Sequence, residues 1–159
     1  HKMNDIKPLP RIMIVEARFY EDIADEMAVG AIAALEEANA EFERFTVPGA
    51  FEIPAAIKFG MRAMDFDSNR RRFDGYIALG CVIRGETTHY DYVCGESARG
   101  LMDLATRYSL ALGYGILTCE NRNQAWARAS RDGGDKGAFA ANTCLEMIAM
   151  KNRLGLYPR

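Results

Sequence analysis

Short apolar runs alternate along the chain with longer stretches in which apolar residues recur every three or four positions. Short runs, whether continuous or alternating, are typical of strands, whereas the longer spacing indicates amphipathic helices. The first pattern predicts strands at 11–15, 42–47, 73–79 and 113–118. The second predicts helices at 22–39, 51–64, 90–108, 122–129 and 136–153. Strands that alternate with helices predict a parallel sheet covered on both faces, a three-layer α/β/α sandwich.

The helix ends and the polar segments add detail to this α/β scheme. Asn39 is a plausible C-cap of the first helix, and Pro54 is acceptable in the first turn of the second. The last helix, 136–153, is apolar on more than one face, so it either lies deep in the fold or faces a partner subunit. The arginine-rich segment 65–72 is interpreted as a solvated loop, with an anion-binding patch as the alternative.

A length of 159 residues predicts one domain, able to bury roughly 70% of its unfolded surface. We expect residues 1–10 to form a flexible N-terminal segment and residues 11–159 to form the domain. Residues 1–2, before Met3, have the form of a tag remnant. The first ten residues are polar and contain proline, unlike a signal peptide, and no apolar run approaches the roughly 18 residues of a membrane span.

Charge and cysteine usage exclude several classes of partner. A net charge of −2 gives no reason to expect nucleic acid or an anionic membrane as a partner. The four cysteines, Cys81, Cys94, Cys119 and Cys144, form no C-x-x-C motif, and two histidines are too few for a zinc site at these spacings. We therefore expect reduced, mostly buried thiols, no bound metal and a cytoplasmic location.

The stretch Gly80-Cys-Val-Ile-Arg-Gly-Glu-Thr-Thr-His89 follows the third predicted strand and precedes a helix. It is interpreted as a glycine-bracketed turn between them, at the sheet edge where α/β proteins bind ligands. Its glycine spacing matches a P-loop, but Glu86 occupies the lysine position and would repel a β- or γ-phosphate. This excludes a nucleoside triphosphate site, while the backbone N–H groups of the helix start could still hold one small phosphate.

His89 is the candidate proton carrier of this stretch. Either Thr87 or Thr88 can cap the helix, which places His89 in the first turn, where the helix dipole disfavours a charged imidazolium. A neutral imidazole there could shuttle protons, and the alternative is an ordinary surface histidine. Cys81, across the turn, leaves open a thiol enzyme that pairs it with His89.

Aromatic residues follow two strand ends. Phe19 and Phe51 each lie just past a predicted strand, and Tyr114 lies in the fourth strand. Each could be an ordinary core aromatic, but together they could sandwich a flat heterocycle. Without further information, Arg128 is a solvated helix residue and Glu52 a carboxylate that favours a helix start.

Four motifs resemble the lumazine synthase family, over about 12–154: Gly80 to His89, Pro48-Gly-Ala-Phe-Glu-Ile-Pro54, Ala17-Arg-Phe19 and Asp135-Lys-Gly137. The resemblance implies a four-stranded sheet of flavodoxin-like order 2-1-3-4. It implies a transferase that condenses 5-amino-6-(D-ribitylamino)uracil with 3,4-dihydroxy-2-butanone 4-phosphate to 6,7-dimethyl-8-ribityllumazine, the penultimate step of riboflavin biosynthesis. No metal or cofactor is implied. The alternative is a non-catalytic flavin- or lumazine-binding module.

The resemblance also implies roles for individual residues. His89 corresponds to the family's catalytic histidine. Glu86 and Thr87, through the backbone of their turn, and Arg128 correspond to phosphate-binding positions. The residues implied for the pyrimidine and its ribityl chain are Phe19, Ala50, Phe51, Glu52, Cys81, Val82, Ile83, Tyr114 and Lys136.

Assembly is the last property that the resemblance implies. Family members form pentamers with each site between neighbouring subunits, and some pack twelve pentamers into a 60-subunit shell. We expect His89, Arg128 and Lys136 to come from one chain, and the side of the site with Phe19, Phe51 and Glu52 to come from that chain or from its neighbour. Ser130 and Asp135 depart from the residues usual in shell-forming relatives, and we expect Asp135 to place a charge where subunits pack. We therefore favour a free homopentamer, with riboflavin synthase as a functional partner.

Overall fold

The computed structural model describes residues 9–66, 69 and 72–156, so the expectations for residues 1–8 and for Arg70 and Arg71 lie outside the described residues. The elements are β1 (Arg11–Ala17), α1 (Glu21–Glu37), β2 (Glu41–Val47), η2 (Ala50–Glu52), α2 (Ile53–Phe66), β3 (Gly75–Ile83), α3 (His89–Tyr108), β4 (Leu112–Cys119), α4 (Arg122–Ala129) and α5 (Lys136–Arg153). None of the helices in these ranges is long and apolar enough to cross a membrane.

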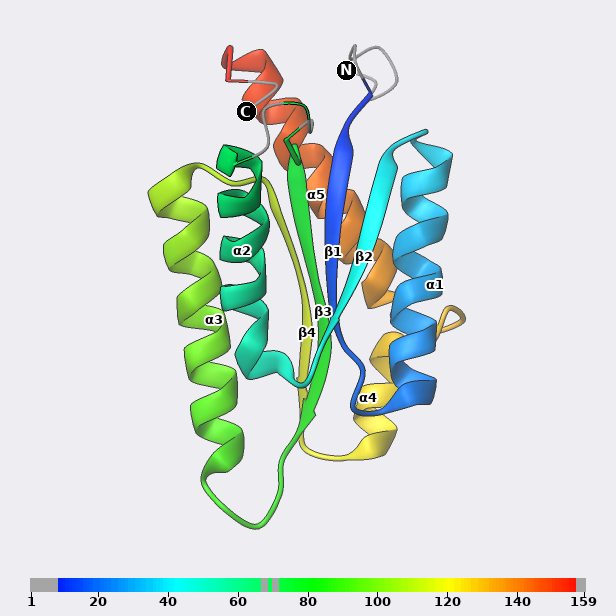
Figure 1. Cartoon of the computed structure of the whole chain (residues 1–159). Coiled ribbons are helices and arrows are strands. Elements are labelled where there is room, and N and C mark those ends of the chain that lie inside the picture. The colour runs from blue at the N-terminus through cyan, green and yellow to red at the C-terminus, as the bar shows by residue number, and fades with distance from the viewer. Residues whose placement is uncertain (1–8, 67–68, 70–71, 157–159) are drawn as a thin grey trace.

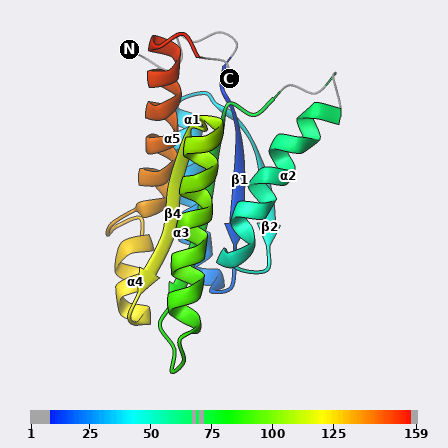
Figure 2. The same ribbon diagram turned by 90° about the vertical axis from the view of Figure 1, so that its left-hand side faces the viewer.

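The strands form one parallel sheet in the order β2-β1-β3-β4, which confirms the predicted topology. Helices α1, α4 and α5 cover one face, and α2 and α3 cover the other (Figure 1). Figure 2 shows the sheet between α4 and α5 on one side and α2 on the other. The three-layer sandwich is therefore confirmed, with helices on both sheet faces and only the edge strand β2 without a fully buried residue.

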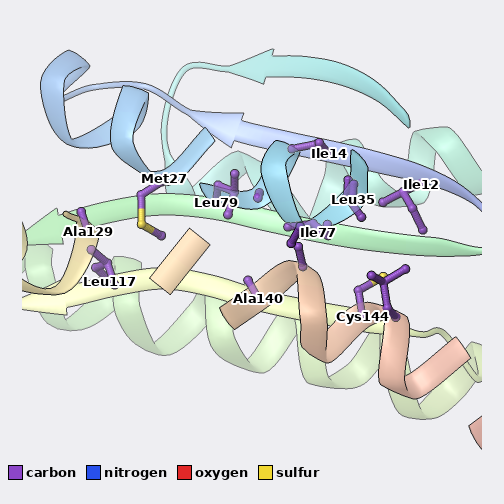
Figure 3. Close-up of a cluster of buried hydrophobic side chains, with 14 of the residues drawn as sticks. Ile12, Ile14, Met27, Leu35, Ile77, Leu79, Leu117, Ala129, Ala140 and Cys144 are labelled. Atoms are coloured by element: carbon purple, nitrogen blue, oxygen red, sulfur yellow. The ribbon is translucent and has the colours of Figure 1, made fainter. Parts of the chain in front are cut away.

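Alternation along β1 separates two hydrophobic cores. Ile12 and Ile14 point into the core beneath α1 and α5, whereas Met13 and Val15 point into the core beneath α2 and α3. Figure 3 shows the first core, in which Ile77 and Leu79 of β3 meet side chains of these helices.

Helices α1 and α5 pack so closely that a Cβ on Gly137 would lie 2.0 Å from the Met27 carbonyl oxygen. Only glycine allows this approach, which sets the position at which α5 begins.

Helix α5, expected either to lie deep in the fold or to face a partner subunit, is buried along one face. Its buried face includes Ala140, Cys144 and Ile148, each 0% exposed, beneath the sheet. Phe139 on the same helix is 60% exposed, and Met147 and Met150 are also exposed. The helix thus packs deep in the fold along one face and presents apolar side chains to its surroundings along another.

The turn predicted to begin at Gly80 was wrong. Strand β3 continues to Ile83, because residues 81–83 pair in register with 117–119 of β4. Gly80 lies inside this strand, and a Cβ there would meet its nearest neighbour at an ordinary 3.5 Å. The apolar, partly β-branched run at 81–83 is what favours strand over turn, so the connection to α3 is only 84–88.

Candidate active site

A groove with a volume of about 480 Å³ opens beyond the carboxyl ends of β1, β2 and β3. This is the sheet edge at which α/β proteins commonly bind ligands, and the volume suits a small molecule. The residues that line it are Phe19, Tyr20, Gly49, Ala50, Phe51, Glu52, Cys81, Val82, Ile83, His89 and Val93. Eight of the candidate residues therefore meet in one place, from four separate segments of the chain.

The two phenylalanines of the groove are exposed rather than buried. Phe19 is 75% exposed and Phe51 is 54% exposed, whereas the neighbouring Ala50 is 6% exposed. Neither ring belongs to a core cluster, which excludes the core-packing alternative for both. Exposed aromatic faces beside a concave surface can stack on a flat ring.

His89 is the first residue of α3, where the groove meets the connection 84–88. Thr88 occupies the N-cap position but makes no side-chain cap hydrogen bond. The Thr87 hydroxyl accepts a weak hydrogen bond from the His89 backbone N–H, at 3.3 Å. The exposed imidazole therefore lies at the helix start, near free backbone donors and next to Glu86 and Thr87, which are also exposed.

Arg84 braces the turn that carries Glu86 and Thr87. Its Nε donates to both carboxylate oxygens of Glu120, at 2.9 and 3.1 Å, which ties the turn to the end of β4. Its guanidinium also lies 4.3 Å from the ring centroid of Tyr90 in the first turn of α3. The turn is thus held at both sides while its own backbone stays accessible.

Arg128 and Lys136 do not line the groove. Arg128 lies on α4, where its Nη1 is 3.4 Å from the Gln124 carbonyl and 3.8 Å from the Cys119 sulfur. Lys136 opens α5, with its Nζ 4.7 Å from the Phe139 ring centroid. Neither cation has a carboxylate within ion-pair distance among the described residues. Both remain available for an anion.

The expected grouping of His89 with Arg128 and Lys136 was wrong for the folded chain. Within this chain, His89 shares its groove with Phe19 and Phe51, which is one of the two arrangements left open for that side of the site. The physical reason is the layer arrangement, because α4 and α5 pack on the sheet face opposite α3. Sequence proximity to the strand ends could not reveal which face each helix covers.

Tyr114 is also separate from the groove. On the edge strand β4 it pairs with Ala78 of β3 and lies near Tyr90 and Cys94 of α3. Burial raises the pKa of its hydroxyl, although the side chain is still 41% exposed. Tyr114 does not line the groove that holds this chain's own Phe19 and Phe51, so the three aromatics do not form one sandwich within a single copy.

Asp135 was expected to place a charge where subunits pack, but its side chain points into its own chain, toward α1. Its Oδ1 is buried, and a Cβ on Gly30 of α1 would lie 2.5 Å from it. This oxygen is 3.1 Å from Arg131 Nε, an ion-pair distance, yet it makes no hydrogen bond of acceptable geometry. The backbone has φ 47°, a left-handed conformation that Asp and Asn both tolerate. The charge is therefore compensated within the chain.

Cys81 lies in the groove but is a poor nucleophile. Burial raises the pKa of its thiol to about 12, so the thiol is protonated at neutral pH. This weakens the thiol-enzyme alternative. We expect Cys81→Ser to keep turnover within about threefold of the wild type, because no step would use the thiolate. Steady-state kinetics with both substrates tests this, and a loss of more than about 100-fold would restore the thiol mechanism.

Three residues of the groove were not predicted from the sequence: Tyr20, Gly49 and Val93. The position of each in the sequence could have indicated it. Tyr20 and Gly49 adjoin predicted site residues, and Val93 is one helical turn after His89 and so shares its face. No three His, Cys, Asp or Glu side chains gather as a metal site in the described part of the chain.

Comparison with known proteins adds a family assignment to this geometry. Residues 10–152 match the family model described as 6,7-dimethyl-8-ribityllumazine synthase. A Rhizobium meliloti protein named 6,7-dimethyl-8-ribityllumazine synthase 1 is 58% identical, over 96% of this chain and 98% of its own length. Proteins named 6,7-dimethyl-8-ribityllumazine synthase from Agrobacterium fabrum and Bartonella tribocorum are 56% and 52% identical, over 92% and 96% of this chain and 97% of each relative.

Proposed function

Because the chain belongs to the 6,7-dimethyl-8-ribityllumazine synthase family, we propose that it condenses 5-amino-6-(D-ribitylamino)uracil with 3,4-dihydroxy-2-butanone 4-phosphate. The product is 6,7-dimethyl-8-ribityllumazine, and phosphate and water are released. The observation that carries the proposal is the groove in which two exposed phenylalanines lie beside His89. This condensation needs a surface on which the pyrimidine can stack and, beside it, a side chain that can carry protons.

The pyrimidine stacks on the phenylalanines of the groove. Backbone groups of Ala50 and of the end of β3, residues 81–83, face the same space and can bind the polar edges of the ring. Glu52 is exposed at the groove and is the acceptor for the ribityl hydroxyls. Shape and stacking thus fix the ring, and directed polar contacts fix its orientation.

His89 moves protons in each step. The 5-amino group of the pyrimidine adds to the ketone, and the adduct loses one water to give an imine. Phosphate is then eliminated, the resulting enol becomes a ketone, and the ribityl-bearing nitrogen attacks this ketone and a second water is lost as the ring closes. Every step transfers a proton and none forms a bond to the protein, so a single imidazole at the groove is sufficient. Much of the rate enhancement comes from holding the two substrates together.

The phosphate of the butanone phosphate binds at the turn 85–88. Arg128 of a neighbouring copy completes this phosphate site. The turn offers backbone N–H groups at the start of α3. Arg128 is a cation without a carboxylate partner among the described residues, and it lies on the far face of its own sheet. A second copy could bring it to this groove, which is consistent with a homo-oligomeric, pentameric enzyme.

Arg128→Ala is expected to raise the KM for the butanone phosphate about 10- to 100-fold, while the affinity for the pyrimidine stays near normal. The lost charge-assisted phosphate contact is worth about 1.5–3 kcal/mol. Steady-state kinetics in each substrate measures both values. Arg107→Ala, at another exposed helical arginine that pairs with Asp103, is the matched control. An equal fall in pyrimidine affinity would reassign Arg128 to a structural role.

Turnover with the two substrates separates this enzyme from a flavin- or lumazine-binding module. Formation of 6,7-dimethyl-8-ribityllumazine can be followed by its absorbance. A protein that binds the lumazine but forms none from the two substrates would be a binding module.

The cellular setting follows from the same chemistry. The product is consumed by riboflavin synthase, which makes that enzyme a functional partner. All four cysteines are free thiols, which suits a cytoplasmic enzyme.

A further inference from the structure

A buried carboxylate lies at the end of β1, three residues before Phe19. Glu16 is 2% exposed. By strand alternation its side chain points to the same sheet face as Ile12 and Ile14, which belong to the core beneath α1. A carboxylate in such surroundings is tolerated only if cations and hydrogen bonds compensate its charge.

Two arginines provide this compensation. Arg44 on the edge strand β2 donates from Nε to Glu16 Oε2 at 2.6 Å and from Nη2 to Oε1 at 3.0 Å, a two-pronged contact. Arg18 donates from Nη1 to Glu16 Oε1 at 2.9 Å, and its Nη2 bonds the carboxylate of Asp25 on α1. The row of alternating charges, Arg44–Glu16–Arg18–Asp25, links β2 and β1 to the 18–20 connection and to α1.

Phe19 follows Arg18 directly, and its own side chain makes few packing contacts. The side chain is 75% exposed and belongs to neither core cluster. Its ring has one aromatic neighbour within the described chain, Tyr20, with ring centroids 4.9 Å apart in an edge-on arrangement. The position of the Phe19 ring over the groove therefore depends on how firmly its flanking residues are fixed.

We propose that Glu16 and Arg18 are positioning residues for Phe19, which hold its ring over the groove before the pyrimidine binds. This inference rests on the proposed function, in which Phe19 stacks on the pyrimidine. A ring that is already in its stacking position spares the substrate the entropic cost of ordering it. A ring that visits this position only part of the time lowers the apparent affinity by that fraction.

Arg18→Met tests the inference with little risk to folding. The variant keeps an unbranched side chain of similar length and leaves Glu16 paired with Arg44. We expect the dissociation constant for the pyrimidine alone to rise about 5- to 10-fold, as for a ring that is in place roughly a tenth to a fifth of the time. The KM for the butanone phosphate and kcat should stay within about twofold. Arg18→Lys, which can reach only one of the two carboxylates, should give an intermediate dissociation constant.

A double-mutant cycle with Phe19→Ala shows whether Arg18 acts through the ring. Once the ring is absent, Arg18→Met should weaken pyrimidine binding no further, so that the two changes are strongly non-additive. Additive losses would overturn the inference, because Arg18 would then contribute to binding independently of Phe19. Arg107→Met, at an exposed arginine paired with Asp103, is the matched control and should leave pyrimidine binding unchanged.

The same measurements separate this inference from the proposed function. If Phe19→Ala leaves pyrimidine binding unchanged, both the stacking role of Phe19 and the positioning role of Arg18 are refuted. If Phe19→Ala weakens binding and both Arg18 variants do not, only the positioning role is refuted. If Arg18→Met fails to fold, Arg18→Lys decides alone, since it preserves the charge beside Glu16.

Discussion

His89→Ala is expected to slow turnover at saturating concentrations of both substrates by about 10- to 100-fold or more, the usual contribution of a positioned general acid–base group. Among the described residues that line the groove, His89 is the one imidazole, and imidazole is the side chain that enzymes use most often for general acid–base catalysis. Substrate binding should weaken less than turnover, because stacking and phosphate contacts come from other residues. Single-turnover kinetics separates the chemical steps from binding and product release.

Thr88→Ala is the matched control for this prediction. Thr88 precedes His89 in the same turn, and its side chain makes no cap hydrogen bond, so the change should alter turnover by less than about twofold. If His89→Ala left the saturated rate constant unchanged, the proton-shuttle role would be refuted. If Thr88→Ala slowed turnover as much as His89→Ala, the shape of the turn rather than the imidazole would limit the reaction.

The sheet and its helices were predictable because their signals are local. Helices α4 and α5 begin and end at the predicted residues, since polar loops with glycine or asparagine flank them. The extension of β3 through Gly80 was missed because two local signals conflict: the apolar run 81–83 favours a strand, whereas Gly80 favours a turn. Glycine usually marks a turn, but here pairing with β4 determined the conformation. Tertiary pairing overrode the propensity of one residue.

The stacking half of the site was predictable for a topological reason. Residues at or just beyond the carboxyl ends of parallel strands meet at one sheet edge, which is why Phe19, Phe51 and Cys81 line the same groove. The position of Arg128 was not predictable in this way. Helix α4 also follows a strand end, but it packs on the other face of the sheet, and a sequence carries no direct signal for that choice.

The assembly prediction now rests on fewer arguments than the sequence offered. The carboxylate of Asp135 is compensated by Arg131 inside the chain, so it does not oppose a subunit contact. The exposed apolar side chains of α5 favour a contact, as do Phe59 and Phe66 of α2, at 70% and 79% exposure. These side chains favour an oligomer but do not distinguish a free pentamer from a larger shell, and the free homopentamer stays a prediction.

Co-assembly of two impaired variants is expected to restore activity if each site is shared between neighbouring copies. A groove with an intact His89 but no Arg128 of its own would then receive Arg128 from the adjacent His89→Ala chain. In randomly mixed rings about one site in four is native, so mixtures should regain roughly a quarter of the wild-type rate at butanone phosphate concentrations below the KM of the Arg128→Ala variant.

The two chains are co-expressed with different tags, and doubly tagged assemblies are purified and compared with each variant alone. Light scattering on the same samples should give a mass near five chains, and a mass near sixty would refute the free pentamer. Activity no greater than the sum of the two variants would show that each copy completes its own site. A fully active monomer would refute the shared site directly, because a monomer has no neighbour to supply Arg128 and its own Arg128 lies across the sheet from the groove.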